Sequence, residues 1–283
     1  MLKLFSFFKS LFLDKSCPLK VKAGLLPDKP DERDHRKTMP VKVGIPTKHF
    51  SLRKYIPAGI LNQRDTGACS GYAAAQAMNI LINRMMELSN KKEAIKFINL
   101  SPTWLYYYAR YYDGSGYQND NGATLRSVIK ALKDPGAIHI SAMDQNYSVT
   151  KQPPENTQNL PKFSISEYAR IFKDATVIET MQRTLDTEHL PIICGVFLYK
   201  ESIENSYYNN GIIKYDKADN DISLGGHALC IIGYRLIDNE LYFECVNSWG
   251  SLYGDNGFCY IPAYIFKDNK YSMDIWTFDK KYF

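Results

Sequence analysis

The feature that most constrains the fold is the distance along the chain between groups whose chemistry belongs together. Cys69 carries a thiol, while His227 and Asn247 carry an imidazole and an amide, and more than half of the 283-residue chain separates the thiol from the histidine. A nucleophilic thiol, a base and an amide that orients the base are the parts of acyl-transfer catalysis. Only a folded domain can bring them together, so the sequence predicts a domain built around a shared site.

The composition is that of a packed globular protein. Hydrophobic residues make up 45% and charged residues 23% of the chain, which is near the average for soluble domains and argues against disorder. The 35 basic and 30 acidic residues are scattered without a basic run, so we expect no nucleic-acid partner. The apolar start is too short, and too interrupted by Ser6, Lys9 and Ser10, to span a bilayer. It also lacks a clear signal-peptide cleavage site, and the compartment stays open.

The six cysteines do not indicate a metal site. They contain no CxxC pair, so the sequence predicts no structural zinc site and no other metal. Four of them lie in apolar, strand-like runs and are expected to be small buried side chains: Cys194, Cys230, Cys245 and Cys259. One or two disulfides remain as an alternative.

The chain divides into an N-terminal extension, residues 1–44, and a domain, residues 45–283. The apolar start of the extension is expected to form a helix packed on the body of the protein. Residues 18–50 are rich in proline and charge, which predicts an extended segment on the surface with little regular structure.

The first half of the domain is predicted to be helical. Residues 71–90 are apolar at helical spacing. Ser101-Pro102 is typical of an N-cap and first helical position, which predicts a second helix. Residues 123–133 predict a third, which Asp134-Pro135-Gly136 ends.

The second half contains β-rich runs separated by Gly, Asn and Asp, including PIICGVFLY, HALCIIGYRLI and ELYFECVNSW. A turn at Asp238 joins two of them as a hairpin. The sequence therefore predicts an α+β fold with a helical lobe over about 63–140 and a mostly antiparallel, barrel-like lobe over about 165–275. The polar stretch 143–161 is interpreted as an excursion on the surface, and the site is expected in the cleft between the lobes.

The predicted helix that follows Cys69 places the thiol at a helix N-terminus, where the partial positive charge lowers a thiol pKa. His227 follows Gly225-Gly226 and opens an apolar strand, which holds the ring on a rigid element. As general base it would take the thiol proton and return it to the leaving amine. A packing cysteine and a core histidine are the structural alternatives.

Asn247 ends the next strand, where its amide oxygen can accept from one ring nitrogen of His227 and fix the tautomer. Trp249 would shield that bond from water. Gln63 lies just upstream of Cys69, and its side-chain N–H2 together with the Cys69 backbone N–H would form an oxyanion hole. A lone glutamine or turn asparagine has an ordinary structural explanation, so each residue gains its meaning from the others.

These motifs resemble the papain-like (C1) cysteine peptidases, the cathepsin family. The matching stretches are QRDTGACSGYA, GGHALCIIGY and NSWGSLYGDNGFCYIP. The resemblance implies a two-lobed papain-like fold, an extended polypeptide substrate, no metal or organic cofactor, and substrate contacts at Asn121, Gly122, Gly226 and Trp249. The sequence sets no oligomeric state, and a monomer is favoured.

The chain departs from the family pattern near its nucleophile. Thr66 replaces the usual cysteine, so the family disulfide at this place cannot form, and Ser70 replaces a bulky aromatic residue. The separation of Cys69 and His227 exceeds the roughly 130–150 residues typical of the family, which fits the polar excursion. These differences leave the disulfides and the substrate preference open.

Two further questions stay open at this stage. Residues 1–44 are interpreted as a short inhibitory prosegment over the cleft, with a strap on the back of the domain as the alternative. The later part of PDKPDERDHR is expected to stay with the mature domain. The predicted activity is peptide hydrolysis through a thioacyl-enzyme, with two alternatives: a thiol acyltransferase or amidase, or a binding module with a decayed site.

Overall fold

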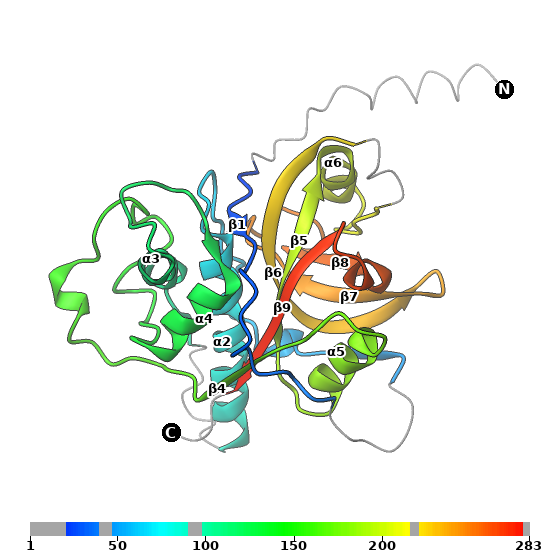
Figure 1. Cartoon of the computed structure of the whole chain (residues 1–283), viewed down its shortest axis with the longest axis horizontal. Helices are drawn as coiled ribbons and strands as arrows, with labels where there is room; N and C mark the ends of the chain where they lie inside the picture. The colour runs from blue at the N-terminus through cyan, green and yellow to red at the C-terminus, as the bar shows by residue number, and fades with distance from the viewer. Residues whose placement is uncertain (1–20, 40–46, 90–97, 216–220, 280–283) are drawn as a thin grey trace.

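A helical part and a curved sheet lie side by side in the computed structural model, which describes residues 21–39, 47–89, 98–215 and 221–279 (Figure 1). The apolar helix expected at the chain start lies outside the described residues. No helix in the described ranges combines the length and the apolar character that crossing a bilayer requires.

Three helices form the helical part, as the sequence predicts. The longest, α2 (Cys69–Leu88), begins at Cys69 and is buried as far as Asn83, because its alanines allow close packing on all sides. Helix α3 (Pro102–Asp113) starts at the Ser101 side chain, which accepts a hydrogen bond from Trp104 N. Thr124 caps α4 (Leu125–Lys133) in the same way. The expected start of the second helix is therefore confirmed, while the third helix starts two residues later than predicted, because Ala123 and Thr124 form strand β3.

The sheet follows the strand order β3-β1-β6-β5-β9-β4, with β2 and β7 also paired to β6 and β8 paired to β7. Among the described strands every pairing is antiparallel except that of β1 with β3. The bounds are β1 (Leu25–Leu26), β2 (His49–Ser51), β3 (Ala123–Thr124), β4 (Glu167–Arg170), β5 (Ile192–Tyr199), β6 (Ser223–Ile237), β7 (Glu240–Val246), β8 (Phe258–Pro262) and β9 (Ser272–Asp279).

The predicted hairpin is formed by β6 and β7. Asp238 and Asn239 join these strands with φ values of 51° and 64°, as a two-residue turn between twisted strands requires. Helices α5 (Val177–Asp186) and α6 (Lys200–Tyr208) lie at opposite ends of the sheet (Figure 1). The hairpin brings His227, on β6, close to Asn247, which directly follows β7.

The polar excursion is less superficial than the sequence predicts. Outside a short 3-10 turn it has no regular structure, yet Met143, Val149 and Thr157 are buried. The buried Arg110 side chain on α3 donates to the Val149 carbonyl oxygen, and Ser101 donates to the Met143 carbonyl oxygen. Backbone carbonyls thus tie the excursion to the helical part, a contact that no periodic pattern signals.

All five described cysteines are free and buried, which confirms the prediction of small buried side chains. Cys245 and Cys259 face one another across β7 and β8 but do not form a disulfide bond. The alternative of one or two disulfides is wrong for the described cysteines.

An extended segment, residues 21–39, runs between the helical part and the sheet, and we call it the strap (Figure 1, dark blue). Its strand β1 pairs with β3 on the helical side and with β6 on the sheet side. Further along, Lys37 N donates to Arg170 O on β4 at 2.8 Å. The strap therefore crosses from one part of the molecule to the other.

Candidate functional site

Cys69 is the first residue of α2, and its side chain is fully buried. Burial raises the pKa of its thiol to about 11, although hydrogen bonds from the backbone of Ala228 and Gly24 favour the thiolate. The sequence predicts a lowered pKa at this helix start, and that expectation is wrong for the chain with the strap in place. Gly24 belongs to the strap, so part of the environment of the sulfur comes from the N-terminal extension.

His227 lies on β6 next to Ala228, the residue whose backbone hydrogen-bonds to the Cys69 sulfur. Its Nε2 is 2.9 Å from Asn247 Oδ1, which can only accept, so Nε2 carries the proton and donates. Nδ1 is buried and has no hydrogen-bond partner. Burial lowers the pKa of His227 to about 4, against the hydrogen bond with Asn247 that favours the charged ring. The structure thus joins His227 to Asn247 by a hydrogen bond and places the backbone of the next residue, Ala228, against the Cys69 sulfur.

Trp249 covers the histidine. Its ring stacks on that of His227 with centroids 4.8 Å apart. Trp249 also makes a T-shaped contact with Tyr253, with ring centroids 4.7 Å apart. Trp249 is only 4% exposed. The expected shielding of the bond between His227 and Asn247 is present.

Gln63 is fixed against the turn that carries Asn247. Its backbone N–H donates to Ser248 O at 2.8 Å, and its Oε1 accepts from Ser248 Oγ. Its Nε2 donates to Thr66 O at 2.7 Å and to Lys22 O, a strap carbonyl, at 3.3 Å. The donor that the sequence assigns to an oxyanion therefore already faces a carbonyl oxygen.

Glycines bring the strap backbone close to the site. A Cβ on Gly24 would lie 2.2 Å from Gly67 O, and a Cβ on Gly122 would lie 2.0 Å from Gly24 O. A Cβ on Gly226 would lie 2.6 Å from Leu25 O. The strap can therefore lie between β3 and β6 only because these positions are glycines.

The residues predicted to contact substrate divide into two groups. Gly122 and Gly226 touch the strap backbone, while Asn121 is exposed beside it. Sequence reasoning missed Ser248 and Asp120, although both adjoin residues that it selected. Asp120 accepts hydrogen bonds from Gly67 N at 2.9 Å and from Tyr106 Oη at 2.7 Å. Its position directly before Asn121-Gly122 was the available signal.

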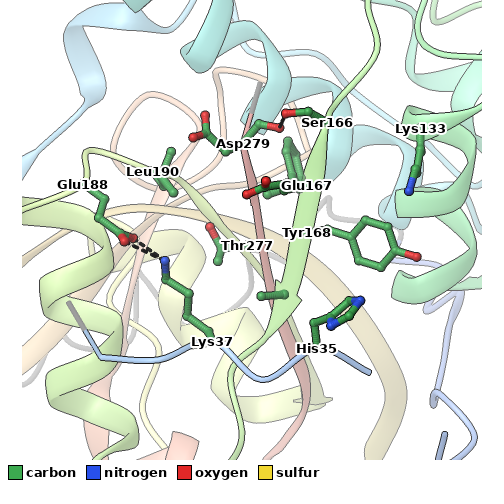
Figure 2. A pocket seen from close by; sticks show the side chains of 12 residues that line it. His35, Lys37, Lys133, Ser166, Glu167, Tyr168, Glu188, Leu190, Thr277 and Asp279 are labelled. Carbon is green, nitrogen blue, oxygen red and sulfur yellow. Dashed lines mark hydrogen bonds and ion pairs between the residues drawn. The ribbon is translucent and has the colours of Figure 1, made fainter. Parts of the chain in front are cut away.

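The structure has a pocket away from Cys69. This pocket of about 660 Å³ lies between the strap and β4, and Figure 2 shows six of its lining residues around the opening: His35, Lys37, Lys133, Glu167, Tyr168 and Glu188. The pocket is not lined by any of the four residues described above: Cys69, His227, Asn247 and Gln63. In the described part of the chain, no group of three or more His, Cys, Asp and Glu side chains is arranged to hold a metal ion.

Comparison with known proteins gives consistent matches. The model of the family described as papain family cysteine protease matches residues 45–274. An uncharacterized peptidase C1-like protein of Acanthamoeba polyphaga mimivirus is 27% identical over 276 residues, covering 89% of this chain and 85% of the relative. A cathepsin B-like protein of Giardia intestinalis is 23% identical, covering 74% of this chain and 66% of its own length.

Solved structures share the fold. Xylellain, a cysteine protease from Xylella fastidiosa, superposes with a TM-score of 0.73 at 24% identity, covering 93% of this chain and 99% of that chain. A Carica candamarcensis cysteine protease in complex with E-64 gives 0.58 at 17% identity, covering 83% and 100%. At these identities the likeness concerns the fold alone.

Proposed function

The chain belongs to the papain family of cysteine proteases, and on that premise we propose that its cysteine peptidase activity rests on four side chains: Cys69, His227, Asn247 and Gln63. The expected papain-like α+β fold is confirmed. Polypeptides are the substrate class that membership implies.

The proposed reaction begins with transfer of the Cys69 thiol proton to Nδ1 of His227. The thiolate attacks the scissile carbonyl carbon, and the oxyanion accepts hydrogen bonds from Gln63 Nε2 and the Cys69 backbone N–H. The imidazolium then protonates the leaving amine, and a thioester remains. Water, deprotonated by His227, attacks the thioester and releases the carboxylic acid and the free thiol.

One observation carries this assignment. The bond from His227 Nε2 to Asn247 Oδ1 leaves Nδ1 unpartnered, while the backbone of the adjacent Ala228 reaches the Cys69 sulfur. A base needs a free lone pair close to the proton that it removes. Of the two ring nitrogens of His227, Nδ1 is the one with an unpartnered lone pair.

We propose in addition that residues 1–44 are an N-terminal extension whose first part, up to β1, is an inhibitory prosegment that covers the site, with residues 45–283 as the catalytic domain. Support comes from Lys22 O at the Gln63 donor and from Gly24 against Gly67. Burial holds Cys69 and His227 neutral beneath the strap, the opposite of the charged pair that attack requires. Displacement of residues 21–26 of the strap would therefore precede catalysis.

The catalytic assignment is tested by hydrolysis of fluorogenic peptides after incubation at acidic pH, and in a full-length Gly24→Val variant that cannot seat the strap. We expect Cys69→Ala to lower kcat/KM at least about 10³-fold, because no other group replaces the nucleophile. Cys194→Ala, at a buried thiol on β5, serves as the matched control and should retain activity. Equal activity of Cys69→Ala and the parent would refute the assignment.

A further inference from the structure

One strap residue reaches two neighbouring groups of the site. Lys22 O accepts from Gln63 Nε2 at 3.3 Å, and Lys22 Nζ lies 2.5 Å from Asp120 Oδ2. The side chain of Asp120 is 14% exposed and that of Lys22 is 43% exposed. Lys22 therefore shows where the side chain of a residue lies when its carbonyl faces Gln63.

Hydrogen bonds from neighbouring groups hold the carboxylate of Asp120 in place. Gly67 N donates to both of its carboxylate oxygens, at 2.9 and 3.1 Å, and Tyr106 Oη donates to Oδ1 at 2.7 Å. Tyr106 in turn accepts from Gly122 N at 2.9 Å. The carboxylate is thus fixed between the segment that leads to Cys69 and the segment that contacts the strap.

The carboxylate is also charged in this environment. Burial alone would raise the pKa of Asp120, but hydrogen bonds from Lys22 and Tyr106 lower it more, so its pKa lies below the usual value. A fixed carboxylate with a remaining exposed edge attracts a cation and repels an anion.

We propose that Asp120 selects a lysine or arginine side chain at the substrate residue whose carbonyl carbon Cys69 attacks. The inference rests on the proposed function, because it takes Gln63 as the marker of the oxyanion. A substrate carbonyl at Gln63 would direct a long basic side chain to Asp120, as Lys22 does in the strap. An acidic side chain at that residue would face the carboxylate and be rejected.

The competing explanation is structural. Asp120 would then serve only to hold Gly67 and Tyr106, and Lys22 would be an incidental counter-ion on the surface. On this explanation the pair would contribute little, as exposed ion pairs do on average. The two explanations differ in whether the charge of Asp120 changes the preference between substrates.

A double-mutant cycle in the full chain tests the subsite within the molecule. Lys22→Met keeps the length of the side chain and removes its charge, and Asp120→Asn removes the opposite charge. The readout is the rate of Cys69 alkylation by iodoacetamide, followed by peptide mass spectrometry. We expect Lys22→Met to speed alkylation about 3-fold or more in the parent and to have no effect in Asp120→Asn, since coupled residues are non-additive.

Lys29→Met, at an exposed strap position, is the matched control and should show no coupling to Asp120→Asn. Additive effects of Lys22→Met and Asp120→Asn would overturn the inference, because they would mean that the strap gains nothing from this ion pair. The cycle gives an answer whether or not the chain cleaves peptides.

A second experiment measures selection of substrate. Matched peptides carry Lys, Arg, Met or Glu at the attacked residue and are offered to the full chain with Gly24→Val. We expect kcat/KM for Lys to exceed that for Met about 5-fold or more at low salt, and the ratio to fall as ionic strength rises. Asp120→Asn should bring the ratio near one, whereas Tyr106→Phe, which keeps the charge, should preserve it. Equal rates for the Lys and Met peptides in the parent would contradict the proposal.

Binding separates failure of this inference from failure of the proposed function. The same peptides are titrated into the Gly24→Val chain with Cys69→Ala, and fluorescence anisotropy reports the complex. One outcome is that the Lys peptide binds preferentially but is not hydrolysed by the Gly24→Val chain that retains Cys69. This outcome would reject the peptidase mechanism and keep the subsite. Hydrolysis without any preference for Lys would reject only the subsite.

Discussion

The amide of Asn247 sets the protonation pattern of His227. Its Oδ1 accepts from His227 Nε2 at 2.9 Å and also from Ser248 N at 2.7 Å, so the amide itself is held in one orientation. The ring therefore keeps its lone pair on Nδ1, and Trp249 protects the bond from water. A single side chain thus links the turn after β7 to the base on β6.

We expect Asn247→Ala to lower kcat by about 10- to 10²-fold while the fold is kept, because the imidazole loses its orienting partner and its fixed tautomer. The pH profile of kcat should shift as well, which a purely structural effect would not produce. Asn205→Ala, at an exposed position of α6, is the control. An unchanged pH profile together with full activity in Asn247→Ala would show that the amide plays no positioning role.

At the scale of elements, the strap contributes only a short strand to the sheet, and this strand lies against the site. Strand β1 has two residues, yet it joins β3 to β6. Ala123 N donates to Gly24 O at 3.0 Å, and Leu25 packs against Gly195 on β5. The strap closes the site through backbone contacts, which depend on glycine at facing positions.

Replacing Gly24 with valine should expel β1, because its Cβ would lie 2.2 Å from Gly67 O, a backbone atom that cannot move aside cheaply. In the parent, a thiol pKa of about 11 predicts slow alkylation of Cys69 at pH 7 and a rate that rises with pH through 9. In Gly24→Val we expect alkylation at pH 7 to be at least about 10-fold faster, with a flatter pH profile.

Leu26→Val is the control for this prediction, because Leu26 lies on the same strand but is 39% exposed. It should alkylate like the parent. If Gly24→Val and Leu26→Val showed the same slow rate and the same pH dependence, the strap would not be the element that limits access to the thiol.

At the scale of the whole molecule, buried charges fasten the strap to both parts. Asp34 on the strap accepts from Arg126 of α4 at 2.6 Å and from Arg170 of β4 at 2.9 Å, and its side chain is 5% exposed. A third ion pair, between Lys37 and Glu188, appears in Figure 2. Residues after β1 therefore connect the helical part to the sheet, which supports the expectation that this later part stays with the mature domain.

We expect Asp34→Asn to destabilise the full chain by about 1.5 to 3 kcal/mol, because the buried side chain loses its charged hydrogen bonds to the half-buried Arg126 and Arg170, although Arg170 keeps its ion pair with Asp274. Thermal unfolding followed by circular dichroism measures the loss as a lower Tm. Asp31→Asn removes a carboxylate paired only with the exposed Arg33, so it should change Tm little. Identical Tm values for Asp34→Asn and Asp31→Asn would mean that this anchor contributes nothing to stability.

The sequence by itself determined the local elements and the order of the reacting groups. Apolar spacing after Cys69, Ser101 before Pro102 and the Asp238 turn each act over a few residues, so their outcomes follow from nearby chemistry. The set of Cys69, His227 and Asn247 was also identifiable, because the stretches around these residues resemble, in the same order, the motifs of a known family.

Only the tertiary structure decided the path of the strap, the burial of Met143, Val149 and Thr157 in the excursion, and the state of the thiol. Burial raises the pKa of Cys69, and it outweighs both the helix terminus that the local sequence signals and the backbone hydrogen bonds of Gly24 and Ala228, which lower the pKa from distant positions in the sequence. Asp120 likewise meets Lys22 across a long stretch of chain. Desolvation and ion pairing depend on distance in space, and no local pattern encodes that distance.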